Sequence, residues 1–282
     1  MKLLNVMQHL YCEPWLILPE MHKQISAIVE DHSTGAAHLP DGRAETFLAT
    51  EKPKEKALRV ENGIAFIDLV GVVALRVGEI EKSSGVTDLI DFENQLVEAA
   101  GRSDVNGILL IIDSPGGSVA GTPEAAALVK KINSQKPVVA FTDSLMVSAA
   151  YWIGSQASMI VASKSAQVGS IGVYQAFLDS SRQAEIQGLK VELFKTGKFK
   201  GMGIDGTPLT DDQRKLLQER VDEVFGWFVD AVTEDRSIPA DAMQGQSFFA
   251  EEAMLNDLID TIGGLPDAIE ELAALMRQKT KE

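Results

Sequence analysis

The sequence is poor in cysteine, aromatic residues and positive charge. Its 282 residues include one cysteine, Cys12, so no disulfide can form within the chain and a reducing compartment is expected. Lys and Arg number 26 against 41 Asp and Glu, which gives a formal net charge of −15. Nucleic acids and anionic membranes bind clustered positive charge, so neither is expected as a partner.

Long apolar runs are also missing. No stretch reaches the roughly 18 apolar residues that a membrane-spanning helix needs. The first 30 residues contain Glu13, Glu20 and Glu30 and lack the basic-then-apolar order of a signal peptide. We therefore expect a cytoplasmic protein without a membrane span.

Histidine is confined to the first 38 residues, where the chain has His9, His22, His32 and His38. Residues 31–60 are polar and rich in turn formers, which is typical of a mobile linker and disfavours a metal site there. We expect an N-terminal segment and flexible linker over residues 1–56 and one domain over residues 57–282. Because residues 39–282 contain no histidine, a nucleophile in that domain needs a base of another kind.

Buried strand-like runs alternate with helical patterns in the predicted domain. The runs occupy residues 63–75, 105–113, 136–143, 158–163 and 190–197, and the clearest helices occupy residues 86–102, 122–136 and 210–236. This alternation predicts βαβ units and a mostly parallel sheet, an α/β fold. The helix at 210–236 follows a capping residue, Thr210, and its apolar stripe predicts packing on the sheet or on a neighbouring subunit.

A Pro-Gly-Gly turn follows the strand predicted at 105–113. Gly116 and Gly117 lie at the carboxyl end of that strand, the edge where open α/β sheets bind ligands. Two glycines there can direct backbone N–H groups at a developing oxyanion. Taken alone, the same residues also fit an ordinary turn between strand and helix.

Ser148 follows the next predicted strand and precedes two alanines. It fits a helix cap, a buried hydroxyl bonded to a carbonyl, or a nucleophile at a strand-to-helix turn. In the last case the N–H of Ala149 is a second oxyanion donor, and a neutral lysine is the obvious base. The segment 194–206 offers Lys195, Lys198 and Lys200, among which physical chemistry alone does not choose.

Several motifs in the same order resemble the signal peptide peptidase A family of serine proteases. They are DSPGGSVAG, SAAYWIGSQASMIVASKSAQVGSIGV and GKFKGMG, together with the closing stretch SFFAEEAMLNDLIDTIGGLPDAI. The amino-terminal YCEPWLILPEMHKQI is similar to the start of the phage branch of that family, which includes the protein C type of capsid protease of lambda-like phages. The resemblance implies a ClpP/crotonase-type fold built from ββα and βαβ units, with a long helix near the carboxyl end used in packing or oligomerisation.

The resemblance also implies roles for single residues. It places the nucleophile at Ser148, the general base at Lys200 and a lysine-orienting serine at Ser170, with the oxyanion turn at Gly116 and Gly117. The chain departs from the cellular pattern in having Ala149 and Ala150 where glycines commonly follow the nucleophile, which leaves the shape of the pocket open. No metal, nucleotide or other cofactor is implied.

Three functions remain open on the sequence. The first is a phage or prophage endopeptidase that cleaves scaffold or other head proteins and works as a homo-oligomeric ring in the host cytoplasm or procapsid. The second is a soluble cytoplasmic peptidase that degrades peptides. The third is a non-proteolytic crotonase-like protein that binds an acyl-thioester or a partner, which the set Ser148, Ser170 and Lys200 disfavours.

Overall fold

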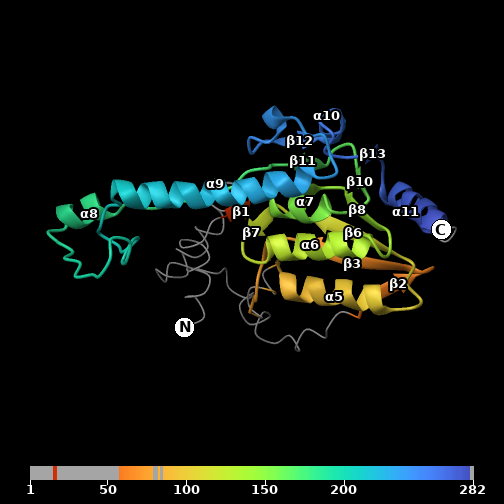
Figure 1. Ribbon diagram of the computed structural model, residues 1–282, viewed down its shortest axis with the longest axis horizontal. Coiled ribbons are helices and arrows are strands. Elements are labelled where there is room, and N and C mark those ends of the chain that lie inside the picture. Colours follow the sequence, from red (N-terminus) through yellow and green to blue (C-terminus); the bar gives the residue numbers. More distant parts are fainter. Residues whose placement is uncertain (1–14, 18–56, 79–81, 83–84, 280–282) are drawn as a thin grey trace, which may run out of the picture.

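A repeated strand–strand–helix unit organises the main part of the protein. The computed structural model describes residues 15–17, 57–78, 82 and 85–279. The first strand of each unit joins a central sheet, the second joins a smaller sheet, and a helix follows where the chain returns (Figure 1). Three units have this form: β3, β4 and α5, in which a further strand β5 pairs with β4; β6, β7 and α6; and β8, β9 and α7. Their bounds are β3 Ile64–Val70, β4 Val72–Ala74, β5 Val86–Asp88, α5 Leu89–Gly101, β6 Gly107–Asp113, β7 Gly116–Ser118, α6 Thr122–Asn133, β8 Val138–Thr142, β9 Leu145–Val147 and α7 Ala149–Gly154.

The central sheet has the strand order β13-β10-β8-β6-β3-β2. Its strands are parallel except for β2 (Arg59–Glu61), which pairs antiparallel with β3. The two remaining strands are β10 (Met159–Ala162) and β13 (Thr261–Ile262). This arrangement confirms the predicted α/β class with a mostly parallel sheet built from repeated units.

Two smaller sheets carry the second strand of each unit. One has the order β1-β7-β4-β5 and includes β1 (Trp15–Ile17) from the amino-terminal segment. The other has the order β12-β11-β9, with β11 at Gln167–Gly169 and β12 at Ser247–Phe249. The predicted segment 1–56 is therefore not wholly separate from the domain, because β1 is one of its strands. The rest of that segment, with Cys12 and the four histidines, lies outside the described residues.

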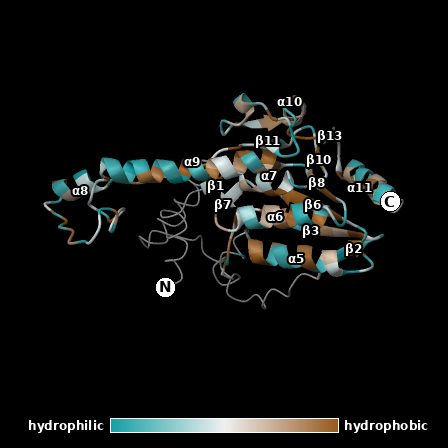
Figure 2. Cartoon of the chain, in the orientation of Figure 1, coloured by the Kyte–Doolittle hydropathy of each residue, from teal (hydrophilic) through white to brown (hydrophobic). Residues whose placement is uncertain are grey.

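Hydrophobic side chains cover both faces of the central sheet. On one face, α5, α6 and α7 contribute Phe92, Val129 and Trp152 to the main core. On the other face, α11 (Leu265–Lys279) packs Ala268 and Leu272 against the strands. Figure 2 shows the strands between these layers as mainly hydrophobic. The sheet edge that carries the turns after β6 and β8 is thereby held on a rigid support.

A helical arm extends from this body. The long helix α9 (Asp211–Thr233) begins with the predicted cap, since Thr210 Oγ1 accepts from the Gln213 N–H at 3.3 Å. Its carboxyl-terminal half packs on the body, while its amino-terminal half projects outward and ends near α8 (Ser181–Ile186) (Figure 1). Figure 2 shows the projecting part of α9 as largely hydrophilic. The predicted stripe of this helix is thus buried in the body only from Val224 onward.

The prediction of a strand at residues 190–197 is wrong. These residues form an exposed loop in the arm and pair with no strand in the described part of the chain. Apolar residues alternate there, but Val191 and Leu193 are both exposed. A strand also needs a neighbouring strand to pack and pair with, and this segment has none among the described residues. The short remaining elements are the 3₁₀ turn at Ala240–Ala242 and α10 (Ala250–Leu255).

Candidate active site

Ser148 lies in a strained turn between β9 and α7. Its backbone has φ 56° and ψ −123°, a conformation that is rare for residues other than glycine and clusters at functional sites. Its N–H donates to the Gly169 carbonyl at 2.8 Å, and its own carbonyl accepts from the Trp152 N–H at 3.0 Å. Hydrogen bonds on both sides hold the residue in this conformation.

The Ser148 side chain has neither of the two structural roles that the sequence left open. The residue is 2% exposed, and its hydroxyl makes no capping hydrogen bond to α7. Within the residues that the structure describes, its Oγ makes no other hydrogen bond either. A buried hydroxyl at a strained turn, without a structural partner, is the arrangement that a nucleophile requires.

The Gly-Gly turn lies directly against Ser148. A Cβ on Gly116 would stand 2.9 Å from the Ser148 Cβ and would overlap the Leu16 carbonyl oxygen, and the Gly116 φ is +99°. A Cβ on Gly117 would overlap the Val73 carbonyl oxygen. Only glycine therefore fits at either position, and the two motifs that the sequence singled out meet in space.

The three predicted oxyanion donors differ in their partners. The Gly116 N–H donates to the Ser114 Oγ at 3.2 Å, so it is directed at a neighbouring side chain. The N–H of Ala149 belongs to the first turn of α7, where N–H groups have no acceptor within the helix. Gly117 lies opposite Leu16 in the β1–β7 pairing, so of the three donors Ala149 is the strongest candidate for holding an oxyanion.

Ser170 is brought next to Ser148 by strand pairing. β9 and β11 are parallel with Val147 opposite Gly169, so the residues that follow, Ser148 and Ser170, leave the sheet side by side. Ser170 is buried and has φ 52°, and its Oγ donates to the Gly245 carbonyl at 3.1 Å. A second strained serine thus stands beside the first.

Lys200 is not brought to Ser148 within one chain. It is exposed and belongs to the loop between α8 and α9, and Figure 1 shows that loop at the outer end of the arm. That loop is held near the start of α9 by the ion pair of Lys198 with Asp212 at 3.0 Å. Phe228 of α9 stacks on Trp152 of α7. Asp212 lies 16 positions before Phe228 in the same helix, which corresponds to about 24 Å along the helix axis.

The three candidate lysines have different surroundings. Lys195 donates to the Lys198 carbonyl at 3.1 Å, and Lys198 is paired with Asp212. In the part of the chain that the structure describes, Lys200 makes no hydrogen bond or ion pair. Of the three, it is the one whose amine is not already held by this chain.

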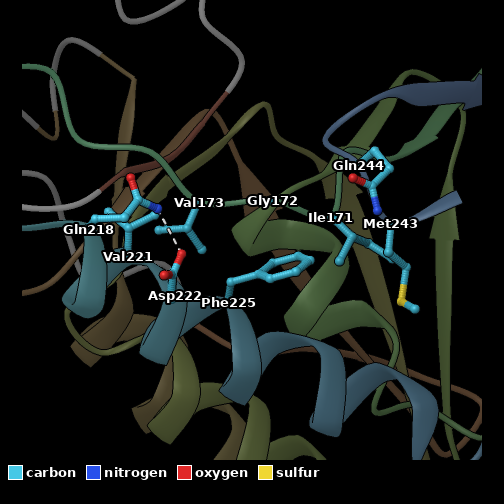
Figure 3. Close-up of a pocket in the computed structure, with 9 residues that line it drawn as sticks. All are labelled: Ile171, Gly172, Val173, Gln218, Val221, Asp222, Phe225, Met243 and Gln244. Atoms are coloured by element: carbon cyan, nitrogen blue, oxygen red, sulfur yellow. Dashed lines mark hydrogen bonds between the residues drawn. The ribbon is translucent and has the colours of Figure 1, made fainter. Parts of the chain in front are cut away.

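A pocket of about 220 Å³ lies beside the site, and sequence reasoning missed it. Figure 3 shows its walls: one is formed by the segment that follows Ser170, and the other by the face of α9 that carries Gln218 and Asp222, which are joined by a 2.7 Å hydrogen bond. The lining residues are Ile171, Gly172, Val173, Gln218, Val221, Asp222, Phe225, Met243 and Gln244. Because its walls come from three separate segments of the chain, residues 171–173, 218–225 and 243–244, no local sequence pattern could have indicated it.

Metal and membrane features are absent from the described residues. No group of three or more His, Cys, Asp or Glu side chains there could hold a metal ion. No helix among them combines the length and the apolar character needed to cross a membrane.

The repeated α/β fold and the buried serine at a strand-to-helix turn define a serine hydrolase-like site. Residues 130–279, more than half of the chain, match the Peptidase family S49, so the chain belongs to this family. This confirms the family predicted from the motifs.

Two phage proteins are among the relatives. The chain is 29% identical to the head-tail preconnector protein GP5 of Enterobacteria phage P21 over 86% of its length, and 31% identical to capsid assembly protease C of Escherichia phage lambda over 76%. It spans 49% of each relative, about half their length. Among solved structures, a membrane-bound stomatin-specific protease aligns with a TM-score of 0.45 and 12% identity, covering 75% of this chain and 85% of that one.

Proposed function

We propose that the chain is a serine endopeptidase with a Ser148–Lys200 dyad that cleaves head proteins during phage capsid assembly. The observation that carries the proposal is the conformation of Ser148, a buried serine without a structural partner, held at a strained turn against Gly116 and Gly117. Membership of the Peptidase family S49 supports the same chemistry.

The chemistry follows from the groups at this turn. The Ser148 Oγ attacks a peptide carbonyl carbon while its proton passes to a neutral lysine amine. The N–H group of Ala149 stabilises the oxyanion, and the Gly116–Gly117 turn lies beside the same point. When the C–N bond breaks, the proton passes from the lysine to the leaving amine. The lysine amine, neutral again, then activates water to hydrolyse the acyl-enzyme.

The base would come from a second copy of the chain. Lys200 belongs to the loop between α8 and α9, which Figure 1 shows at the outer end of the arm, so in the proposed enzyme a neighbouring copy supplies it. The arm also exposes large apolar side chains, including Phe194 at 91% and Ile186 at 80%, which a second copy would cover. Ser170 would then hold the incoming amine toward Ser148. A homo-oligomeric ring satisfies these requirements.

The phage role is supported by the relatives. Both phage proteins have names that concern head assembly, and one is called a capsid assembly protease. The substrates would be scaffold or other head proteins, and the place of action the host cytoplasm or the procapsid. No observation in this structure favours general peptide degradation or acyl-thioester binding over this function.

A fluorophosphonate probe tests the nucleophile. The wild-type chain should be labelled, and Ser148→Ala should lose the label while keeping its circular dichroism spectrum. Ser144→Ala is the matched control, because Ser144 is an exposed serine of the preceding turn and should keep full labelling. Equal labelling of Ser148→Ala would overturn the proposal.

Mixing two inactive variants tests whether the base comes from a neighbour. Ser148→Ala and Lys200→Ala should each be inactive, but co-assembled at equal amounts they should recover about a quarter of wild-type peptide hydrolysis, because one pairing in four combines both intact residues. No recovery in a mixed oligomer would place the dyad within one chain.

A further inference from the structure

The strand β1 is the one part of residues 1–56 that the structure describes, and it is buried. Trp15, Leu16 and Ile17 are 4%, 0% and 3% exposed. Leu16 packs in the main core, whereas Trp15 and Ile17 face the other way and pack with Val72. This alternation is that of a strand inserted between two layers.

Two walls hold β1, and both belong to the candidate active site. On one side β1 pairs antiparallel with β7, the strand of the Gly-Gly turn. On the other side the Trp15 N–H donates to the Tyr174 carbonyl at 2.8 Å, and the Tyr174 N–H donates to the Trp15 carbonyl at 3.2 Å. Tyr174 lies four positions after Ser170. β1 thus fills the slot between the oxyanion turn and the segment that follows Ser170.

The strand also runs toward the nucleophile. Its register places Trp15 opposite Ser118, Leu16 opposite Gly117 and Ile17 opposite Gly116, so its carboxyl end lies at the Ser148 side. A Cβ built on Gly116 would meet both the Leu16 carbonyl oxygen and the Ser148 Cβ, so these two groups flank the same point. A peptide substrate would present its acyl side to Ser148 in this same direction.

We propose that β1 is an internal pseudosubstrate that closes the peptide-binding cleft until it is displaced. The proposal rests on the proposed function of Ser148. Substrates would bind as an extended strand between β7 and the segment ending at Tyr174, using backbone hydrogen bonds on both edges. The buried position of Leu16 calls for an apolar side chain in that strand. Because β1 is tethered, it competes at high effective concentration.

A reversible lock tests whether β1 must leave. The variant combines Trp15→Cys with Ser118→Cys and replaces the native thiol by Cys12→Ser. The backbone N–H and carbonyl of Trp15 both bond to Tyr174, so Trp15 faces Ser118 as a non-hydrogen-bonded pair, whose Cα atoms lie about 4.5 Å apart. That spacing suits a disulfide. The oxidised protein should hydrolyse peptides and take up the fluorophosphonate at least about tenfold more slowly than the same protein after reduction. Equal rates would overturn the proposal.

A second measurement does not depend on catalysis. In the Ser148→Ala background, Leu16→Asp buries a carboxylate and should expel β1. This double variant should bind a fluorescent peptide EPWLILPE, the sequence of residues 13–20, at least about tenfold more tightly than Ser148→Ala alone. Val70→Asp, at an exposed position, is the matched control and should leave peptide binding unchanged. A folded Leu16→Asp variant that gains no affinity would contradict the inference, whereas a gain in binding without any labelling of Ser148 in the active background would contradict the proposed function alone.

Discussion

Phe228 joins the arm to the helix that carries the nucleophile. Its ring stacks on that of Trp152, with centroids 4.7 Å apart and planes inclined by 6°, and both side chains are buried. Trp152 lies one turn after Ser148, and its N–H donates to the Ser148 carbonyl. Loss of the Phe228 ring should therefore affect both the stability of the fold and the geometry of the site.

The expected cost of Phe228→Ala follows from burial. Replacing a fully buried phenylalanine by alanine costs about 3–5 kcal/mol, because it removes transfer free energy and leaves a cavity. A typical domain is stable by about 5–15 kcal/mol, so the variant should fold but unfold at clearly lower urea concentration. The rate of fluorophosphonate labelling should fall with it, since Trp152 loses the surface that fixes its position.

Trp227→Ala is the control, since Trp227 is the neighbouring aromatic residue and is 48% exposed. It should cost less than about 1 kcal/mol. Both variants are compared by urea unfolding, monitored by far-ultraviolet circular dichroism at one protein concentration, because the proposed assembly would make apparent stability depend on concentration. If the two variants lost equal stability, or Phe228→Ala lost less than about 1 kcal/mol, the stacked contact would not anchor the arm.

Three further predictions concern the base, the turn and the linker. Lys200→Arg should abolish peptide hydrolysis, because arginine keeps its proton, whereas Lys198→Arg should retain most of the activity. If the activities were in the reverse order, Lys198 and not Lys200 would be the base. Gly116→Ala should abolish fluorophosphonate labelling, because a Cβ there would stand 2.9 Å from the Ser148 Cβ at a positive φ, whereas Gly101→Ala, with open space around it, should label normally. Limited proteolysis should first cut within residues 31–56; mass spectrometry showing a first cut elsewhere would contradict the predicted linker.

The parts of the fold that depend on local signals could be predicted from the sequence. The run at 105–113 became β6, and Thr210 starts α9 because its cap involves residues three positions apart. The run at 63–75 was predicted as one strand, but it divides at Gly71 into β3 and β4. A Cβ on Gly71 would overlap the Gly85 carbonyl oxygen, which is a tertiary contact that no local pattern contains.

The candidate site was predictable only in part, for a related reason. Gly116 and Gly117 lie just beyond β6, and Ser148 lies one short strand beyond β8; β6 and β8 are neighbours in the parallel central sheet, so the turns after them meet at the same edge. The proximity of Ser170 depends on the pairing of β9 with β11, two strands too short to be recognised in the sequence. Lys200 belongs to the loop between α8 and α9, and its approach to the Ser148 of a second chain is part of the proposal, not of the fold of a single chain.

The role of β1 depends on its neighbour rather than on its own residues. Three apolar residues after Pro14 are too few to show a period, and only pairing with β7 gives them a place. The two proposals together amount to two independent barriers to cleavage by one chain: the proposed base, Lys200, comes from a second copy, and β1 fills the proposed cleft. Assembly would supply Lys200 without removing β1. The oxidised Trp15→Cys, Ser118→Cys protein should therefore assemble like the wild type in size-exclusion chromatography and still fail to cleave peptides. Loss of assembly on oxidation would show that the two barriers are coupled.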